Sequence, residues 1–344
     1  MPTRGRRIHS TPGHSRLGLL PLNPEEKPAD AYQHFSSLDS KKRQHLFEAM
    51  NKTKLQCNGF LHNLEKNRQP IPIRENFRVK TDDYVPALYA KLERDEYVLW
   101  QAPTKASCLG FWINVWKDNV KLILSLSEKV GESDTDKCYA YWPMKEGSSM
   151  TLENGRYTIK LLKKNDHRGF YSYDMELTST DEVETFSVQK KMDKSTEEED
   201  NEDKKIRQVT LFHYDSWPEG TWPNIDTFAN CIQMLTKKEI EMLRKSIDQF
   251  TPPVILQGFG GVGRTAVAWV SAILMKDVEK KDCFDIPNLI RSLIKIHPPA
   301  FHNKIYHLVT YAVGFRCAGL TNWLRPDDVK KYVRDIETAY KDSK

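Results

Sequence analysis

The sequence predicts a mixed α/β domain of the α+β type, and three observations lead to this fold class. Short apolar segments that look like strands fill the middle of the chain. From Ile225 onward the apolar residues instead recur at helical spacing. One strand–loop–helix unit occupies residues 253–275. Strands that come first and helices that follow point to a single domain in which a twisted mixed sheet is flanked by helices.

The strands are expected in the part of the chain before Ile225. Segments with a strand pattern lie at residues 84–99, 120–126, 156–162, 169–177, 184–188 and 208–214. The last four look like antiparallel strands. A short amphipathic helix is expected at 111–119, between the first two strands. Helix formers with apolar positions at helical spacing also fill residues 37–65.

The later helices are expected from periodicity and from proline. Apolar side chains fall on one face of each of two helices, namely Phe228, Ile232 and Leu235, and then Val267, Val270 and Leu274. Pro287 stands near the first position of a further helix, where a proline is tolerated because that N–H has no helical partner. Pro326 marks the start of the last helix.

Composition and charge limit the classes of function. The 344 residues are 39% hydrophobic, which is enough for a sizeable core, and the net charge of +5 is too mild to indicate nucleic-acid binding. No apolar run approaches the roughly 18 residues that a membrane span needs. The six widely spaced cysteines suit reduced thiols in a cytoplasmic protein. Neither a metal site nor a cofactor is expected.

The charge is uneven along the chain. Residues 1–30 are rich in Arg, Pro, Ser and Gly, so a disordered basic segment is expected there. The domain is expected over 31–320, with an acidic loop at 196–204, and a C-terminal helix over 321–344. Both charged runs are interpreted as solvated segments, and a binding role for either one is the alternative.

A glycine-rich turn after residue 257 is the most informative feature. It reads Gly258-Phe259-Gly260-Gly261-Val262-Gly263 and is followed by Arg264 and a helix. Taken alone, the turn matches the dinucleotide pattern GxGxxG and nearly matches the nucleotide loop GxxxxGK[ST]. The first pattern needs further strands and an acid about 20 residues on, whereas helices follow here. The second needs a Lys, and Arg is not equivalent to it.

Other blocks of the chain give the turn a different interpretation. In order, they are Lys66-Asn67-Arg68, Asp83-Tyr84 with Ala87, Gln101-Ala102-Pro103, Phe111-Trp112 with Val115-Trp116 and Asn119-Val120, Lys137-Cys138 with Tyr141-Trp142-Pro143, and Phe212-His213-Tyr214 with Trp217-Pro218. Together with the turn that leads to Arg264, they resemble the protein tyrosine phosphatase family over about residues 40–320. The resemblance implies a single tyrosine-phosphatase-like domain, and the aromatic residues of these blocks are expected in its core.

The resemblance also implies which positions would carry the chemistry. In that family a cysteine attacks phosphorus, an Asp protonates the leaving group and a Gln positions the hydrolytic water. Here Gly258 stands at the cysteine position, Glu219 stands at the Asp position, and no glutamine follows Gln257. Gln69 replaces the Tyr that stacks on the substrate ring. Because glycine has no side chain to attack with, a pseudophosphatase without catalytic residues is expected.

The turn keeps the parts that bind an oxyanion. Backbone N–H groups ahead of a helix, together with a bidentate Arg, bind phosphate without any nucleophile. The phosphate-binding candidates are Phe259, Gly260, Gly261, Val262, Gly263 and Arg264, and the recognition-loop candidates are Lys66, Asn67, Arg68 and Gln69. The alternative is that Arg264 and Thr265 only hold the loop, while the bulk of Phe259 crowds the pocket.

The leading hypothesis for function is a pseudophosphatase that binds phosphotyrosine-containing or other signalling proteins. The chain resembles the tyrosine phosphatase-like proteins of bracoviruses, the viruses that parasitoid wasps deliver into caterpillars. This resemblance implies a role in the host cell cytoplasm, where such a protein would suppress immune-cell adhesion and phagocytosis. One alternative is a weak residual phosphatase that uses Glu219 and a water. The other is an interaction scaffold whose pocket is empty.

Overall fold

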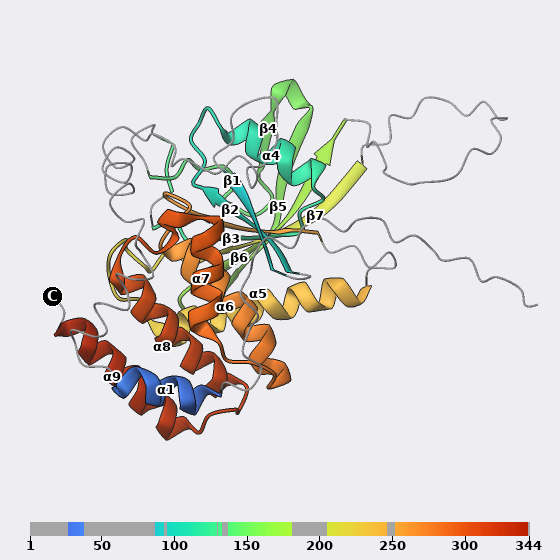
Figure 1. The fold of residues 1–344 in the computed structure, drawn as a ribbon. Helices are drawn as coiled ribbons and strands as arrows, with labels where there is room; N and C mark the ends of the chain where they lie inside the picture. Colours follow the sequence, from blue (N-terminus) through green and yellow to red (C-terminus); the bar gives the residue numbers. More distant parts are fainter. Residues whose placement is uncertain are drawn as a thin grey trace, which may run out of the picture.

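The computed structural model describes residues 27–37, 87–92, 95–128, 130–132, 137–180, 205–245 and 252–342. Within these residues one sheet of eight strands has the order β1-β2-β8-β3-β7-β6-β5-β4 (Figure 1). The strands are β1 (Ala87–Leu92), β2 (Asp95–Gln101), β3 (Leu122–Ser125), β4 (Ser149–Leu152), β5 (Tyr157–Asp166), β6 (Tyr171–Ser179), β7 (Lys205–His213) and β8 (Val254–Gly258).

The sheet is mixed, as the sequence predicts. Strand β8 lies in the parallel part, between β2 and β3, and β3 is also parallel to β7. The remaining pairs are antiparallel. All five residues of β8 are buried, which agrees with the apolar run at 254–256, because a parallel central strand is covered on both faces. Gly258, the last residue of this strand, therefore lies in the interior of the protein.

One strand prediction differs from the structure, and another is not tested by it. The segment 84–99 was predicted as one strand, but its described part forms the antiparallel pair β1 and β2, with Ala87 opposite Trp100. The reversal falls in a polar stretch, with Lys91 exposed and Asp95 and Glu96 only partly buried, and no glycine or proline marks a turn there. The predicted strand at 184–188 lies outside the described residues.

The helices enclose the sheet in two layers (Figure 1). Strand β2 divides its side chains between these layers, because Tyr97 and Leu99 join one hydrophobic core while Val98 and Trp100 join the other. The first core includes residues of every helix below except α4, which contributes to the second core. The helices are α1 (Pro28–Ser37), α4 (Cys108–Lys117), α5 (Ile225–Lys245), α6 (Arg264–Lys280), α7 (Ile286–Ile296), α8 (Lys304–Leu320) and α9 (Pro326–Lys341).

The predicted helix starts are confirmed where proline marks them. Helix α7 begins with Asp285 as its N-cap, whose carboxylate accepts a hydrogen bond from the Asn288 N–H at 3.2 Å, and Pro287 lies in the first turn. Helix α9 begins at Pro326. The described aromatic residues of the family-like blocks are also in the core, as predicted: Trp112 is fully buried and its Nε1 donates to the Tyr141 carbonyl at 2.7 Å.

Several charged segments fall wholly or partly outside the described residues. Residues 28–30, which were expected within the disordered segment 1–30, form the first turn of α1, and Tyr32 of that helix stacks on Tyr332 of α9. The rest of that segment and the acidic loop 196–204 are not among the described residues. The helix predicted at 37–65 also lies outside them, apart from Ser37, which ends α1.

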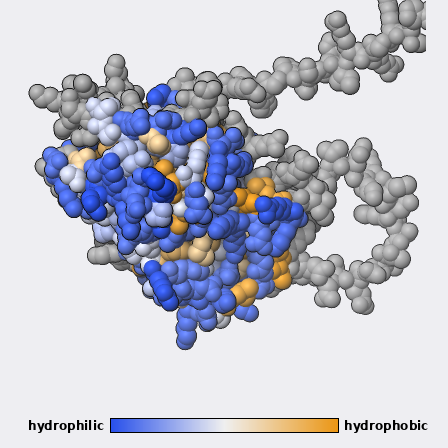
Figure 2. All heavy atoms as spheres, turned by 90° about the horizontal axis from the view of Figure 1, so that it is seen from below, coloured by the Kyte–Doolittle hydropathy of each residue, from blue (hydrophilic) through white to orange (hydrophobic). Residues whose placement is uncertain are grey.

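The described surface is largely polar on the face seen in Figure 2. Seen from below, most of it is hydrophilic, and apolar residues form only small areas (Figure 2). No helix in the described part of the chain is both long and apolar enough to cross a membrane. Five cysteines lie in described segments, and each is a buried thiol that forms no disulfide among these residues.

Candidate functional site

The glycine-rich turn connects β8 to α6 and is shaped by two left-handed glycines. Gly261 has a φ of 64° and Gly263 has a φ of 58°, a conformation that residues with a Cβ rarely adopt. The Gly261 N–H donates to the Gly258 carbonyl at 3.1 Å, and the Gly263 N–H donates to the Ala300 carbonyl at 2.8 Å. These two candidate N–H groups are therefore engaged by carbonyl groups of the protein itself.

Gly258 sits at the end of β8 in close contact with the first turn of α6. A Cβ placed on this residue would come within 3.0 Å of the Thr265 methyl carbon. Its carbonyl accepts a hydrogen bond from the Ala102 N–H at 2.7 Å, which fixes the strand end against the segment that follows β2. Position 258 therefore contributes backbone but no side chain to the loop.

Gln257, which precedes the turn, is completely buried and hydrogen-bonded. Its side-chain Oε1 accepts from the Tyr141 hydroxyl at 3.3 Å, and its Nε2 donates to Ser127 Oγ at 2.9 Å. Nε2 also lies 3.8 Å from Cys138 Sγ. Buried amide groups stabilise a fold only when they are paired in this way, so Gln257 anchors the loop from beneath.

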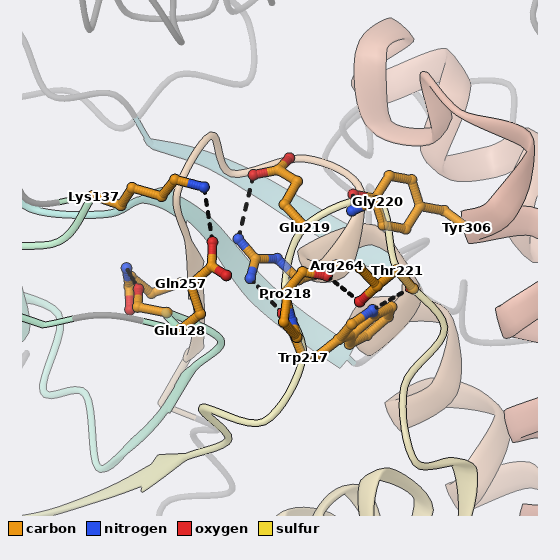
Figure 3. A network of polar contacts seen from close by, with 11 residues as sticks. Glu128, Lys137, Trp217, Pro218, Glu219, Gly220, Thr221, Gln257, Arg264 and Tyr306 are labelled. Carbon is orange, nitrogen blue, oxygen red and sulfur yellow. Dashed lines mark hydrogen bonds and ion pairs between the residues drawn. The ribbon is translucent and has the colours of Figure 1, made fainter.

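Arg264 is the charged centre of the site. Its residue is only 2% exposed, and its guanidinium donates in two directions (Figure 3). Nη1 donates to the Trp217 carbonyl at 2.7 Å, and Nη2 lies 3.4 Å from Glu219 Oε2. The structure thus brings together the predicted phosphate-binding Arg264 and the predicted general-acid position Glu219 in one ion pair.

The turn that carries Glu219 is fixed by its neighbours. Trp217 is fully buried, and its Nε1 donates to the Thr221 carbonyl at 2.8 Å. The Thr221 hydroxyl donates to the Pro218 carbonyl at 2.6 Å. Gly220 has a φ of 73°, which closes the turn, and its N–H donates to the Tyr306 hydroxyl at 3.2 Å. These contacts hold the turn next to Arg264 (Figure 3).

Tyr306 of α8 is a site residue that the sequence did not reveal. Its hydroxyl binds the Gly220 N–H, and its ring lies so close to Gly263 that a Cβ there would approach within 2.6 Å. Burial raises the pKa of this hydroxyl, and the negative charge of Glu219 raises it further. Tyr306 therefore remains neutral and connects the glycine-rich turn with the turn at 217–221.

A second ion pair lies beside the first. Lys137 Nζ is 2.8 Å from Glu128 Oε1, and the same ammonium lies 5.5 Å from the centroid of the Phe259 ring. Phe259 is only 7% exposed. Its side chain is therefore packed into the protein, so Phe259 could reach a ligand mainly through its backbone.

His297, at the end of α7, supports the turn from behind. Its side chain is buried and forms a hydrogen bond with the backbone of Gly261. Burial lowers the pKa of His297 to about 4, so the imidazole is neutral at pH 7. Because a single histidine after a helix has no distinctive pattern, this contact could not be predicted from the sequence.

The structure does not place the recognition-loop candidates. Lys66, Asn67, Arg68 and Gln69, the recognition-loop candidates, lie outside the described residues. Within the described segments, no three His, Cys, Asp or Glu side chains are grouped so that they could hold a metal ion. Arg264, at the first position of α6, is a buried cation at a helix N-terminus, an arrangement that favours anions in general.

The family model for protein-tyrosine phosphatases matches residues 63–313, which is most of the chain. This chain therefore belongs to the protein-tyrosine phosphatase family, and its fold is a single tyrosine-phosphatase-like domain.

Individual relatives are distant. The chain is 24% identical over 244 residues to tyrosine-protein phosphatase non-receptor type 2 of Homo sapiens, a match that covers 69% of this chain and 52% of the relative. It is 26% identical over 244 residues to the mouse (Mus musculus) non-receptor type 20 protein, covering 68% and 49%. The chain thus spans about half the length of these relatives. Tyrosine phosphatase-like protein J1 of Microplitis demolitor bracovirus is 23% identical over 273 residues, covering 73% of this chain and 81% of the relative.

Proposed function

We propose that this chain is a catalytically inactive tyrosine phosphatase-like protein that acts by binding phosphotyrosine-containing or other signalling proteins. The observation that carries the proposal is the environment of Gly258. This residue ends the buried strand β8 and leads into the turn before Arg264, yet it brings no side chain to the loop. Covalent phosphoryl transfer needs a nucleophile at that place, and glycine supplies none.

The proposed binding of a phosphorylated partner rests on the glycine-rich turn and on Arg264. Gly261 and Gly263 keep the left-handed conformations that bend the backbone, and Arg264 begins α6 with its charged group in the interior. The N-terminus of a helix and a buried guanidinium both favour an anion. A phosphorylated side chain is the ligand with this charge that the family membership suggests.

A calorimetric titration with a phosphotyrosine peptide and its unphosphorylated form tests the proposal. Binding of the phosphorylated form alone, abolished by Arg264→Ala and weakened by Arg264→Lys, is the expected result, because Lys keeps the charge but loses the bidentate fork. Arg291→Ala is the matched control, since Arg291 is exposed on α7. Equal affinity for both peptides would contradict the proposal, and circular dichroism would establish that each variant is folded.

We also propose that the protein works in the cytoplasm of an infected host cell, where it suppresses immune-cell adhesion and phagocytosis. The support is the similarity to the bracovirus tyrosine phosphatase-like protein, which extends over 81% of that relative. Expression in cultured insect haemocytes, followed by counts of adherent cells and of ingested particles, tests this role. Wild-type protein should lower both counts, and Arg264→Ala should restore them.

An interaction scaffold with an empty pocket is the second candidate. It is favoured by the state of Arg264, whose two terminal nitrogens already bind the Trp217 carbonyl and the Glu219 carboxylate. A scaffold would capture partners equally well after Arg264→Ala. Deletion of residues 1–26, of 196–204 or of α9 would then identify the segment that binds.

A further inference from the structure

We infer that Glu219 is an internal ligand of Arg264, which the oxyanion of a phosphorylated partner must displace. This inference rests on the proposed function and adds to it the control of the same site. The Arg264 guanidinium presents Nη2 to Glu219 Oε2 at 3.4 Å while Nη1 binds a main-chain carbonyl. A carboxylate thus takes the place beside Nη2 at which a phosphate oxygen would bind.

The two contacts of Arg264 differ in how they could be broken. The Trp217 carbonyl belongs to a residue that is fully buried, so the Nη1 contact is part of the packed interior. The Glu219 side chain is 21% exposed, whereas that of Arg264 is 3% exposed. Glu219 is therefore the partner that reaches solvent, and an incoming anion meets Arg264 from the side that Glu219 occupies (Figure 3).

The position of the Glu219 carboxylate follows from a rigid support. The turn that carries it is closed at Gly220, held by the Tyr306 hydroxyl, and anchored by the buried Trp217 ring. Trp217 also packs against Phe228 of α5, with ring centroids 5.0 Å apart. Because the turn is held at these points, the Glu219 carboxylate stays near Arg264 at a low cost in conformational entropy. Its effective concentration at Arg264 is therefore high, and a ligand has to compete with it.

The charges around the loop also favour an internal competitor. The two ion pairs, Arg264 with Glu219 and Lys137 with Glu128, place two cations beside two carboxylates. A phosphate dianion therefore approaches four described side chains whose formal charges sum to zero. Neutralising Glu219 would leave one excess positive charge on Arg264, within a site that is shielded from water.

Glu219→Gln tests the inference, because glutamine keeps nearly the same shape and loses the charge. Titration with the phosphotyrosine peptide and with inorganic phosphate should give affinities about tenfold higher than those of wild type, as expected when one charged hydrogen bond no longer competes. Binding that is detectable only in Glu219→Gln supports the inference equally. Glu128→Gln is the matched control, since it removes the same charge from the neighbouring pair with Lys137.

The outcomes separate the inference from the function on which it rests. Phosphopeptide binding that depends on Arg264 but is equal in wild type and Glu219→Gln would overturn the inference and leave the proposed function intact. An equal gain in affinity in Glu128→Gln would also overturn the inference, because the gain would then come from the net charge of the site and not from the release of Arg264. Absence of binding in every variant would overturn both, since removal of the competing carboxylate would have opened no site.

Discussion

The methyl group of Thr265 fills the space beside Gly258. A Cβ on residue 258 would lie 3.0 Å from this methyl carbon and 3.9 Å from the Cβ of Leu126, and the first distance is closer than ordinary contacts allow. The Thr265 hydroxyl is buried and has no hydrogen-bond partner among the described residues. Positions 258 and 265 are therefore packed together as a pair, in which the glycine makes room for the methyl group.

Gly258→Cys should therefore fail to restore phosphatase activity. The new side chain must push Thr265 aside, at a cost of about 1 kcal/mol or more in the free energy of unfolding. Glu219 also remains paired with Arg264, so the site would still lack a free general acid. Hydrolysis of a phenyl phosphate ester and urea denaturation measure the two effects. Turnover near that of an active phosphatase would show that the missing nucleophile alone determines inactivity.

The control for this prediction is the double variant Gly258→Cys with Thr265→Ser. Serine lacks the methyl group, so the double variant should recover most of the lost stability while Thr265→Ser alone changes it little. If the single cysteine variant is as stable as wild type, the contact between positions 258 and 265 does not restrict the loop.

Gly263→Ala should disrupt the loop more than any substitution at Gly258. Residue 263 has a φ of 58°, and its Cβ would come within 2.6 Å of the Tyr306 ring. The backbone strain and the clash together should cost about 2 kcal/mol or more, and phosphopeptide binding should be lost. Thermal unfolding and calorimetry give both readouts. Gly110→Ala in α4 is the control, because a Cβ there meets nothing within 4 Å and alanine favours a helix.

The strand–loop–helix unit was predictable because its signals are local. A continuous apolar run predicts the buried strand β8, glycines predict a bend, and apolar residues at helical spacing predict α6. The proline-marked starts of α7 and α9 were predictable for the same reason. Each of these signals depends only on the conformational preferences of neighbouring residues.

The contacts that complete the site could not be predicted from local patterns. Tyr306 is 86 residues from Gly220 in the sequence, and Glu219 is 45 residues from Arg264. Such pairs form only when the helices have packed, so nothing in the flanking residues specifies them. The position of Glu219 was predicted from the family resemblance, but its ion pair with Arg264 depends on the closed turn at 217–221, which needs the folded structure.

His297 should make the protein less stable in acid. Its pKa is lowered by burial from an ordinary value of 6.5 to about 4, so the unfolded chain binds the proton more readily than the folded one. This difference in pKa does not affect stability above pH 6.5. As the pH falls from 6.5 to 4, it lowers the free energy of unfolding progressively, by about 3 kcal/mol in total. Urea denaturation of wild type and His297→Asn at several pH values measures it, and the variant should show the shallower dependence. Parallel curves for the two proteins would contradict the assignment.

Lys276→Met should destabilise the protein, because it removes the cation that neutralises a buried carboxylate away from the candidate site. The Lys276 ammonium lies 2.6 Å from Asp95 Oδ1 and 3.0 Å from Glu239 Oε1, and Glu239 is only 3% exposed. Without the ammonium, the Glu239 carboxylate is left buried with the Tyr97 hydroxyl as its hydrogen-bond donor among the described residues, which should cost about 3–5 kcal/mol in the free energy of unfolding.

The same variant should show a pH dependence of defined sign. Burial already raises the pKa of Glu239, and the ammonium of Lys276 opposes that rise. Removing the ammonium raises the folded-state pKa further, so the loss of stability is largest at high pH and shrinks as acid protonates the carboxyl group. Adding Glu239→Leu should recover most of the stability, because the buried charge is then gone as well. A cost below about 1 kcal/mol for Lys276→Met would mean that solvent reaches Glu239 and replaces the ammonium.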